Sequence, residues 1–222
     1  EILRTTARQF LETLRFWTRP HRDNLALITR TTGVELFDAA LASDRGVIVA
    51  APHYGNWELL NQWLAWRTPI SVLYRPPESE VGEAFLRRVR ADSAERVTQV
   101  RAGGPAAVRL LLKLLRAGGV AGILPDQQPK VGDGEFVPFF GMDALTMTLM
   151  GRLAARTGAT VLFAWCERIG AGPAGALQVE AAPAAVADPD PVVATTALNA
   201  AVERIARRDP GQYQWTYKRW RW

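Results

Sequence analysis

The sequence predicts an α/β fold: a single domain whose helices cover both faces of a largely parallel central sheet. Apolar runs of strand length alternate along the chain with longer segments of helical period, which is typical of this class. Three of these runs are closed by a proline within two residues. With 222 residues and 48% hydrophobic side chains the chain can bury one sizeable core, so residues 1–222 are expected to form one domain.

The N-terminal segment, residues 2–19, is expected to be an amphipathic basic helix that ends at Pro20. Its apolar side chains recur near helical spacing, and arginines stand between them. The apolar set is Ile2, Leu3, Phe10, Leu14 and Trp17. A surface helix packed on the domain is the favoured interpretation, and a helix at the edge of a bilayer fits the same pattern.

The stretch 46–60 carries the most chemistry. Residues 47–51 form an apolar run that predicts a buried strand, and Pro52 ends it. His53 follows at the carboxyl end of that strand, where α/β proteins bind their ligands. After a turn at residues 54–56, Trp57 opens a segment of helical period with Glu58 in its first turn.

His53 and Glu58 are candidates for acid–base chemistry. Because a turn separates them, Glu58 can accept a hydrogen bond from one ring nitrogen of His53 and leave the other to face a substrate. The chain has only two histidines, and His21 lies in a polar group that is typical of a surface. The alternative is a buried histidine beside a glutamate that the helix dipole favours.

The remaining segments continue the alternation. Residues 34–42 are expected to form a short strand or helix, and residues 136–141 an apolar loop after a flexible turn. Residues 182–191 are expected to be a connector. Strands are expected at residues 69–74, 97–100, 120–124, 160–167 and 177–181, and helices at residues 57–66, 79–92, 106–117, 147–156 and 192–208.

Polar residues follow two further strands. Arg75 comes directly after residues 69–74, and Asp126 comes after residues 120–124, at the edge where the His53 loop also arrives. A turn-forming aspartate is the alternative for Asp126. Thr146 or Thr148 is expected either to cap the helix at residues 147–156, which is favoured, or to meet a substrate.

Six short motifs together resemble one family. They are HYGNWE, YRPP, LRRVR, LPDQQPK with GDGEFVPFFG, and a C-terminal PxQYxWxxxR arrangement. They resemble the late lipid A acyltransferases, whose His-x4-acid motif lies after a hydrophobic strand, and the resemblance covers residues 33–222. It implies an acyltransferase-type, three-layer fold with a twisted, mixed or largely parallel sheet.

The resemblance also implies roles for individual residues. His53 would be the base and Glu58 its partner, and one of the arginines would stabilise the oxyanion or bind a sugar phosphate. The expected substrate-binding residues are Arg75, Arg88, Arg90, Asp126, Asn56 and Thr146, and the expected acyl groove contains Trp57, Phe139 and Phe140. No metal and no dissociable cofactor is expected.

The resemblance implies a lipopolysaccharide-biosynthesis transferase. It would move a fatty acyl chain from an acyl carrier protein thioester to a hydroxyl of a lipid A precursor. Transfer to another glycolipid or to a lysophospholipid is the alternative within the same chemistry. A basic membrane-binding or nucleic-acid-binding module without catalysis is the alternative from another class, and it leaves HYGNWE unexplained.

The charge pattern favours anionic partners. Net charge is +5, and 24 of the 27 basic residues are arginine, which suits nucleic acid, an anionic membrane surface, phosphorylated substrates or an acidic carrier protein. Residues 210–222 interleave aromatic and basic side chains, a pattern typical of the lipid headgroup zone or of single-stranded nucleic acid binding. The resemblance favours lipid, with Trp220 and Trp222 as contacts, and no nucleic acid.

The sequence contains no apolar run long enough to span a bilayer, and its single cysteine, Cys166, is expected in the core. Together with the basic and aromatic terminal segments, the resemblance implies that the chain lies on the cytoplasmic face of a bacterial inner membrane. It would be peripheral there or anchored by an N-terminal segment absent here.

Overall fold

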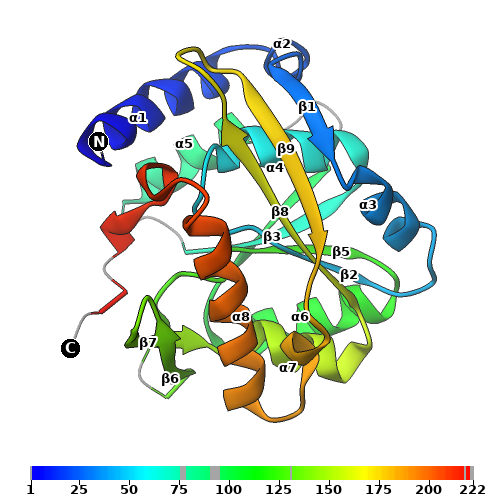
Figure 1. Ribbon diagram of the computed structural model, residues 1–222. Coiled ribbons are helices and arrows are strands. Elements are labelled where there is room, and N and C mark those ends of the chain that lie inside the picture. The colour runs from blue at the N-terminus through cyan, green and yellow to red at the C-terminus, as the bar shows by residue number, and fades with distance from the viewer. Residues whose placement is uncertain (1, 76–78, 91–95, 131, 218, 221–222) are drawn as a thin grey trace.

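The computed structural model describes residues 2–75, 79–90, 96–130, 132–217 and 219–220, which form a central sheet with helices on both faces (Figure 1). The sheet has seven strands in the order β1-β9-β8-β2-β5-β3-β4. They are β1 Ile28–Thr32, β2 Val47–Ala50, β3 Ile70–Tyr74, β4 Val97–Arg101, β5 Val120–Ile123, β8 Thr160–Arg168 and β9 Gly175–Ala181. The α-helices are α1 Ile2–Thr18, α2 His21–Leu25, α3 Val34–Leu41, α4 Trp57–Arg67, α5 Glu80–Arg90, α6 Gly104–Arg116, α7 Leu149–Thr157 and α8 Pro191–Ala206.

The sheet is mixed, which confirms the predicted fold class. Strands β8, β2, β5, β3 and β4 are all parallel to one another. Strand β9 turns back antiparallel beside β8, and β1 pairs parallel with β9, so these two strands at one side of the sheet run in the opposite direction.

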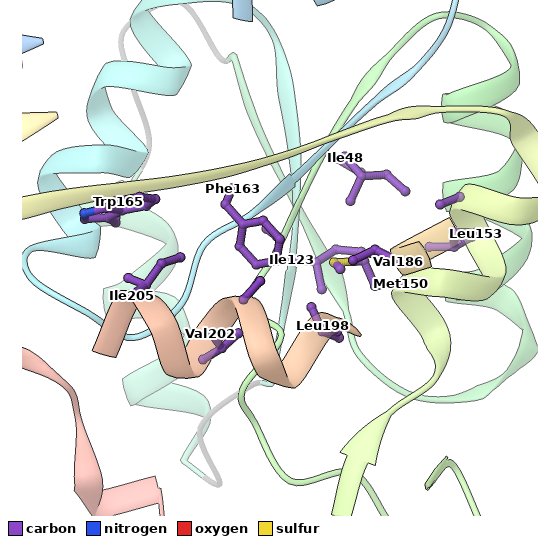
Figure 2. Close-up of a cluster of buried hydrophobic side chains, with 14 of the residues drawn as sticks. Ile48, Ile123, Met150, Leu153, Phe163, Trp165, Val186, Leu198, Val202 and Ile205 are labelled. Carbon is purple, nitrogen blue, oxygen red and sulfur yellow. The ribbon is translucent and has the colours of Figure 1, made fainter. Parts of the chain in front are cut away.

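The two sheet faces bury separate cores because strand side chains alternate. In β2, Val47 and Val49 join a cluster with Phe16 of α1 and with residues of α3 and α4. Ile48 and Ala50 point to the other side, where α6, α7 and α8 pack. Figure 2 shows this second cluster, in which Leu198, Val202 and Ile205 of α8 face the sheet.

The region around residues 134–147 differs from the prediction. The expected apolar loop is the hairpin of β6, Gly134–Phe139, and β7, Met142–Met147, with Phe140 and Gly141 at its turn. The following helix α7 begins at Leu149, so Thr146 lies in β7 and cannot cap it, whereas Thr148 occupies the N-cap position without a capping hydrogen bond from its side chain. Pattern reasoning missed the hairpin because its residues are apolar on both faces rather than alternating: β6 packs on α8 while β7 buries Ala144 and Leu145.

For three other elements, the sequence either left the type open or gave no prediction. Residues Val34–Leu41 form a helix rather than a strand, and α2 and β1 were not predicted. Helix α4 is buried from Glu58 to Ala65, so its apolar surface packs in the core. Cys166 is fully buried in β8, as predicted, and burial raises the pKa of its thiol to about 12.

Helix α1 packs on the body through the side opposite its apolar stripe. Its buried residues are Glu12 and Phe16. The stripe at the other side is exposed, with Leu3 at 85%, Phe10 at 64% and Leu11 at 66% of their full surface. The sequence therefore predicted the amphipathic helix, but the domain contacts a largely polar face of it.

Among the described residues, no helix combines the length and the apolar character needed to cross a bilayer.

Candidate active site

His53 and Asp126 meet because two neighbouring parallel strands end in register. Ala50 of β2 pairs with Ile123 of β5, the last residue of each strand. His53 and Asp126 each follow three residues later, so both arrive at the same carboxyl edge of the sheet. This is the edge at which α/β proteins bind ligands.

The two side chains form a close buried pair. Nδ1 of His53 lies 2.7 Å from Oδ1 of Asp126, and the backbone N–H of His53 donates to Oδ2 over 2.8 Å. His53 is 2% exposed and Asp126 is 1% exposed. Because Nδ1 is engaged by the carboxylate, any proton exchanged with a substrate has to pass through Nε2.

The charge of Asp126 is maintained by its neighbours. Burial alone would raise the pKa of this carboxyl group, but the His53 ring and its hydrogen bonds, together with the Arg219 guanidinium, hold that pKa below its ordinary value. Asp126 is therefore an ionised acceptor that can hold the imidazole and compensate a positive charge on it.

Glu58, the predicted partner of His53, lies in the first turn of α4 and is 1% exposed. The partner that the structure gives to Nδ1 comes from the end of β5 instead. Asp126, expected to bind substrate, therefore occupies the place that the sequence assigned to Glu58. A hydrogen bond between Glu58 and His53 stays a prediction.

The loop that carries His53 is fixed by backbone contacts on both sides. Gly55 has a φ of 67°, and a Cβ at this position would lie 2.1 Å from the carbonyl oxygen of Cys166, so only glycine fits. The N–H of Asn56 donates to that same carbonyl oxygen over 2.7 Å. The turn HYGN thus holds His53 against β8.

Asn56 connects this loop to α1. Its side-chain oxygen caps α4 by accepting from the N–H of Leu59, and its amide donates to Oε2 of Glu12 over 3.1 Å. The same Glu12 oxygen accepts from Nε of Arg168 at 2.5 Å. These contacts give Asn56 a structural role, and its expected contact with substrate stays a prediction.

The C-terminal segment reaches the same site. The N–H of Gln214 donates to the carbonyl oxygen of His53 over 2.9 Å, and the Tyr213 hydroxyl is hydrogen-bonded to the Asp126 carboxylate. Sequence reasoning missed Tyr213 and Arg219 as site residues. The only signal for them was the PxQYxWxxxR arrangement, which was interpreted as a membrane contact.

The predicted acyl-groove residues lie in different environments. Phe139 is completely buried, whereas Phe140 and Trp57 are half-buried. Phe139 and Phe140 belong to an aromatic cluster whose other members are Tyr213, Trp215 and Trp220. Trp220 packs on Phe139 and Trp215 rather than standing free as a lipid contact, and Trp222 lies outside the described residues. The groove itself stays a prediction.

The remaining predicted residues are spread around the site. Arg75 is exposed directly after β3, at the same sheet edge as His53, and Arg88 is exposed on α5. The Arg90 side chain lies outside the described part of the structure. Thr146 is 1% exposed and accepts from Nη2 of Arg219 over 2.9 Å, so it supports the C-terminal segment.

Within the described ranges, no three histidine, cysteine or acidic side chains come together in a way that could hold a metal ion.

Comparisons with known proteins identify the family of this chain. A model of the family described as bacterial lipid A biosynthesis acyltransferase matches residues 1–222. Two relatives from Mycobacterium tuberculosis, strains CDC 1551 / Oshkosh and ATCC 25618 / H37Rv, are phosphatidylinositol mannoside acyltransferases. Each is 28% identical over 173 residues, which cover 77% of this chain and 54% of the relative. The chain spans about half the length of these curated relatives. Because the family model matches its whole length, the chain belongs to the bacterial lipid A biosynthesis acyltransferase family.

Proposed function

We propose that this protein transfers a fatty acyl chain from an acyl carrier protein thioester to a hydroxyl group of a lipid A precursor. The observation that carries the proposal is the His53–Asp126 pair, buried at the carboxyl edge of the sheet with Nδ1 and Oδ1 2.7 Å apart. Family membership supports acyl transfer as the reaction and a glycolipid as the acceptor.

The chemistry follows from the orientation of His53. Nε2 takes the proton of the acceptor hydroxyl while the oxygen attacks the thioester carbonyl carbon. The negative charge of Asp126 offsets the positive imidazolium that forms. When the tetrahedral intermediate collapses, the carbon–sulfur bond breaks, and Nε2 returns the proton to the departing thiolate. The developing oxyanion needs a donor, for which Arg75, Arg88 and Arg90 are the candidates.

The preference for an acidic carrier protein as donor rests on charge. Helix α6 presents Arg109, Lys113 and Arg116 along one side around a shallow depression, all exposed and without a carboxylate partner among the described residues. A carrier rich in acidic residues would associate faster with such a face, and the gain would fall with salt.

A second acceptor class is favoured by a specific observation. The two mycobacterial relatives are named for phosphatidylinositol mannoside, a mannosylated glycolipid rather than lipid A. Both acceptors present a sugar or acyl hydroxyl close to phosphate, so the same base and the same arginines serve either one.

The apolar side of α1 supports a peripheral location on the cytoplasmic face of the inner membrane. Leu3, Phe10 and Leu11 are exposed together with Arg15 and Arg19. Apolar side chains flanked by arginine are typical of helices that lie in the interface of an anionic bilayer.

The proposal is tested with purified protein, acyl carrier protein or coenzyme A loaded with one acyl chain, and either a lipid A precursor or a mannosylated phosphoinositide. Mass spectrometry of the lipid product identifies the donor and the acceptor. His53→Ala should reduce turnover by at least about a thousandfold because it removes the base, and His21→Ala is the matched control. A folded His53→Ala protein with near-normal turnover would disprove the mechanism.

The two acidic residues are separated in the same assay. Asp126→Asn should lose most activity because the amide cannot hold the charged imidazole. Glu58→Ala should also lose most activity, and Glu58→Asp less, if Glu58 acts on His53 as the motif implies. Wild-type turnover by Glu58→Ala would assign the acidic role to Asp126 alone.

A further inference from the structure

The C-terminal segment lies along the catalytic loop like a short added strand. The N–H of Gly55 donates to the carbonyl oxygen of Gln212 over 3.1 Å. The N–H of Gln214 donates to the carbonyl oxygen of His53 over 2.9 Å. Between these two bonds Tyr54 and Tyr213 form an antiparallel bridge. We call Gln212, Tyr213, Gln214 and Arg219 the C-terminal clamp. Its backbone fixes the loop from His53 to Gly55.

The side chains of the clamp reach the carboxylate behind His53. The Tyr213 hydroxyl is hydrogen-bonded both to the Asp126 carboxylate and to the Arg219 guanidinium. Tyr213 and Arg219 are each 3% exposed. A tyrosine hydroxyl buried against a carboxylate stays protonated, and burial followed by the Asp126 charge raises the pKa of Tyr213 well above its ordinary value. It can therefore only donate to Asp126.

Arg219 is anchored so that its charge stays near Asp126. Its Nη2 donates to Oγ1 of Thr146 over 2.9 Å and to Oδ1 of Asn199 over 3.0 Å. Its guanidinium carbon lies 4.6 Å from the centre of the Phe139 ring. Within the described residues it forms no direct ion pair, and its Nε and Nη1 are buried without a hydrogen-bond partner. Asp126 is thus the carboxylate whose charge offsets it, across the Tyr213 hydroxyl.

We propose that Tyr213 and Arg219 position the catalytic pair: they hold the Asp126 carboxylate, and through it they keep His53 in the tautomer with its proton on Nδ1. Neither side chain touches the reacting atoms, so both are positioning residues. The role of Tyr213 and Arg219 in acyl transfer rests on the proposed function, whereas their effect on the tautomer of His53 does not.

Changing the clamp has a defined electrostatic consequence. The charged and titratable groups recorded around Asp126 in the described chain are His53 from the loop after β2, and Tyr213 and Arg219 from the clamp. Removing the Tyr213 donor or the Arg219 charge leaves the carboxylate less stabilised. Asp126 then binds a protonated His53 more strongly, so the midpoint at which His53 titrates moves to higher pH.

The test is a nuclear magnetic resonance titration of the full chain labelled with 15N at histidine. The chain has two histidines, so His21 serves as the internal reference for His53. In the wild type, the proton of neutral His53 should reside on Nδ1. In Tyr213→Phe the midpoint of His53 should rise by about half a pH unit or more, with partial loss of that tautomer.

Tyr54→Phe is the matched control. Tyr54 is also completely buried and lies in the same bridge, but its hydroxyl donates to Oε1 of Glu167 at 3.0 Å instead of Asp126. Its removal should leave the His53 titration unchanged. A wild-type titration and tautomer of His53 in folded Tyr213→Phe overturns the proposal, and so does an equal shift in Tyr54→Phe.

Two variants of Arg219 distinguish the effect of its charge from the effect of its packing. Arg219→Lys keeps the charge and should keep the His53 midpoint near that of the wild type, whereas Arg219→Gln should shift it upward as Tyr213→Phe does. If the Arg219→Gln protein does not fold, the comparison of Tyr213→Phe with Tyr54→Phe still tests the proposal. Equal midpoints in folded Arg219→Lys and Arg219→Gln contradict the role of the charge.

The kinetic arm uses the acyl transfer assay. Tyr213→Phe should lower kcat about tenfold or more with little change in KM, and the acidic limb of its pH profile should move upward with the His53 midpoint. The magnetic resonance readout needs no substrate. Absence of acyl transfer would therefore refute the proposed function without affecting the clamp, and an unshifted midpoint would refute the clamp alone.

Discussion

Asp126 is the residue whose position depends most directly on the sheet. It lies where β5 ends beside β2, and the equal spacing of three residues after Ala50 and Ile123 brings it to His53. The sequence predicted both strands, each ended by a proline. It also predicted that Asp126 lies at the same edge of the sheet as His53. The register that pairs them was not predictable, because it depends on how two strands 73 residues apart align.

The charge of Asp126 makes the stability of the protein depend on pH. Because its pKa is lower in the folded protein than its ordinary value of 3.8, the ionised group stabilises the fold above that pH. The contribution is lost as pH falls through the lower, folded value. Asp126→Asn should therefore reduce the free energy of unfolding by about 3 kcal/mol at pH 7, with the deficit shrinking below about pH 4.

Urea unfolding at several pH values measures this dependence. Asp143→Asn is the matched control, because Asp143 is an exposed aspartate in β7 and its loss should change stability little at any pH. A deficit for Asp126→Asn that stays constant down to pH 3 would mean that the lost hydrogen bonds, and not the charge, stabilise the fold.

At the scale of elements, the β6–β7 hairpin depends on α8. A two-stranded hairpin is marginal by itself in water, and here Asn199 of α8 donates to the carbonyl oxygens of Val137 and Pro138. Glu203 of α8 accepts from the N–H of Phe140. Phe140 has a φ of 52° and Gly141 a φ of 78°, the left-handed pair that two-residue hairpin turns use.

The turn at Phe140 and Gly141 is a second reason why the sequence predicted a loop instead of a hairpin. Glycine and asparagine are the usual residues at the first turn position, and a phenylalanine there gives no hairpin signal. The backbone strain is held by contacts of the ring. Its centroid lies 4.9 Å from that of Phe139 and 5.2 Å from that of Trp215, and the Arg207 guanidinium stacks over it.

The two phenylalanines should respond differently to truncation. Phe139→Ala should lower the free energy of unfolding by about 3–5 kcal/mol, because it leaves a cavity in a completely buried site. Phe140→Gly should cost much less, since relief of the left-handed strain offsets part of the lost packing. Urea titration of both variants checks this order. An equal or larger loss in Phe140→Gly would show that the ring contacts outweigh the strain.

At the scale of the whole molecule, both ends of the chain meet at the catalytic loop. Figure 1 shows α1, in blue, beside the C-terminal segment, in red, and Gln9 of α1 contacts Gln214. Glu12 of α1 holds Asn56, and Gln214 holds His53. Sequence patterns predicted both terminal segments, and they favoured an N-terminal helix packed on the domain. They did not predict that either segment contacts the catalytic loop, because contacts across some two hundred residues leave no local periodicity.

The orientation of α1 follows from the same contacts. Buried Glu12 pairs with Arg168, so the polar side of the helix faces the body and its apolar side faces outward. A hydrophobic pattern cannot reveal this, because it usually marks the side that packs. Trp17 then contacts Phe85 of α5, whose neighbour Val81 is 79% exposed, so the apolar surface extends over two helices.

This surface predicts how the protein binds a bilayer. Phe10→Ser with Leu11→Ser should weaken binding to vesicles of phosphatidylethanolamine and phosphatidylglycerol about tenfold or more at every salt concentration, because apolar burial is not screened. Arg15→Gln with Arg19→Gln should weaken binding mainly at low salt, by about 1 kcal/mol for each cation. Co-sedimentation across a salt series separates the two effects.

A control variant in α8 tests whether vesicle binding is directed through α1. Val192 and Val193 lie in the first turn of α8 and are 49% and 42% exposed, so Val192→Ser with Val193→Ser removes exposed apolar surface from another element. This control should bind vesicles like the wild type. Trp220→Ala should affect folding of the aromatic cluster more than binding, since its ring packs on Phe139 and Trp215. Equal losses in the α1 and α8 variants would show that binding is not directed through α1, and the catalytic edge that α1 flanks would then have no fixed orientation toward lipid.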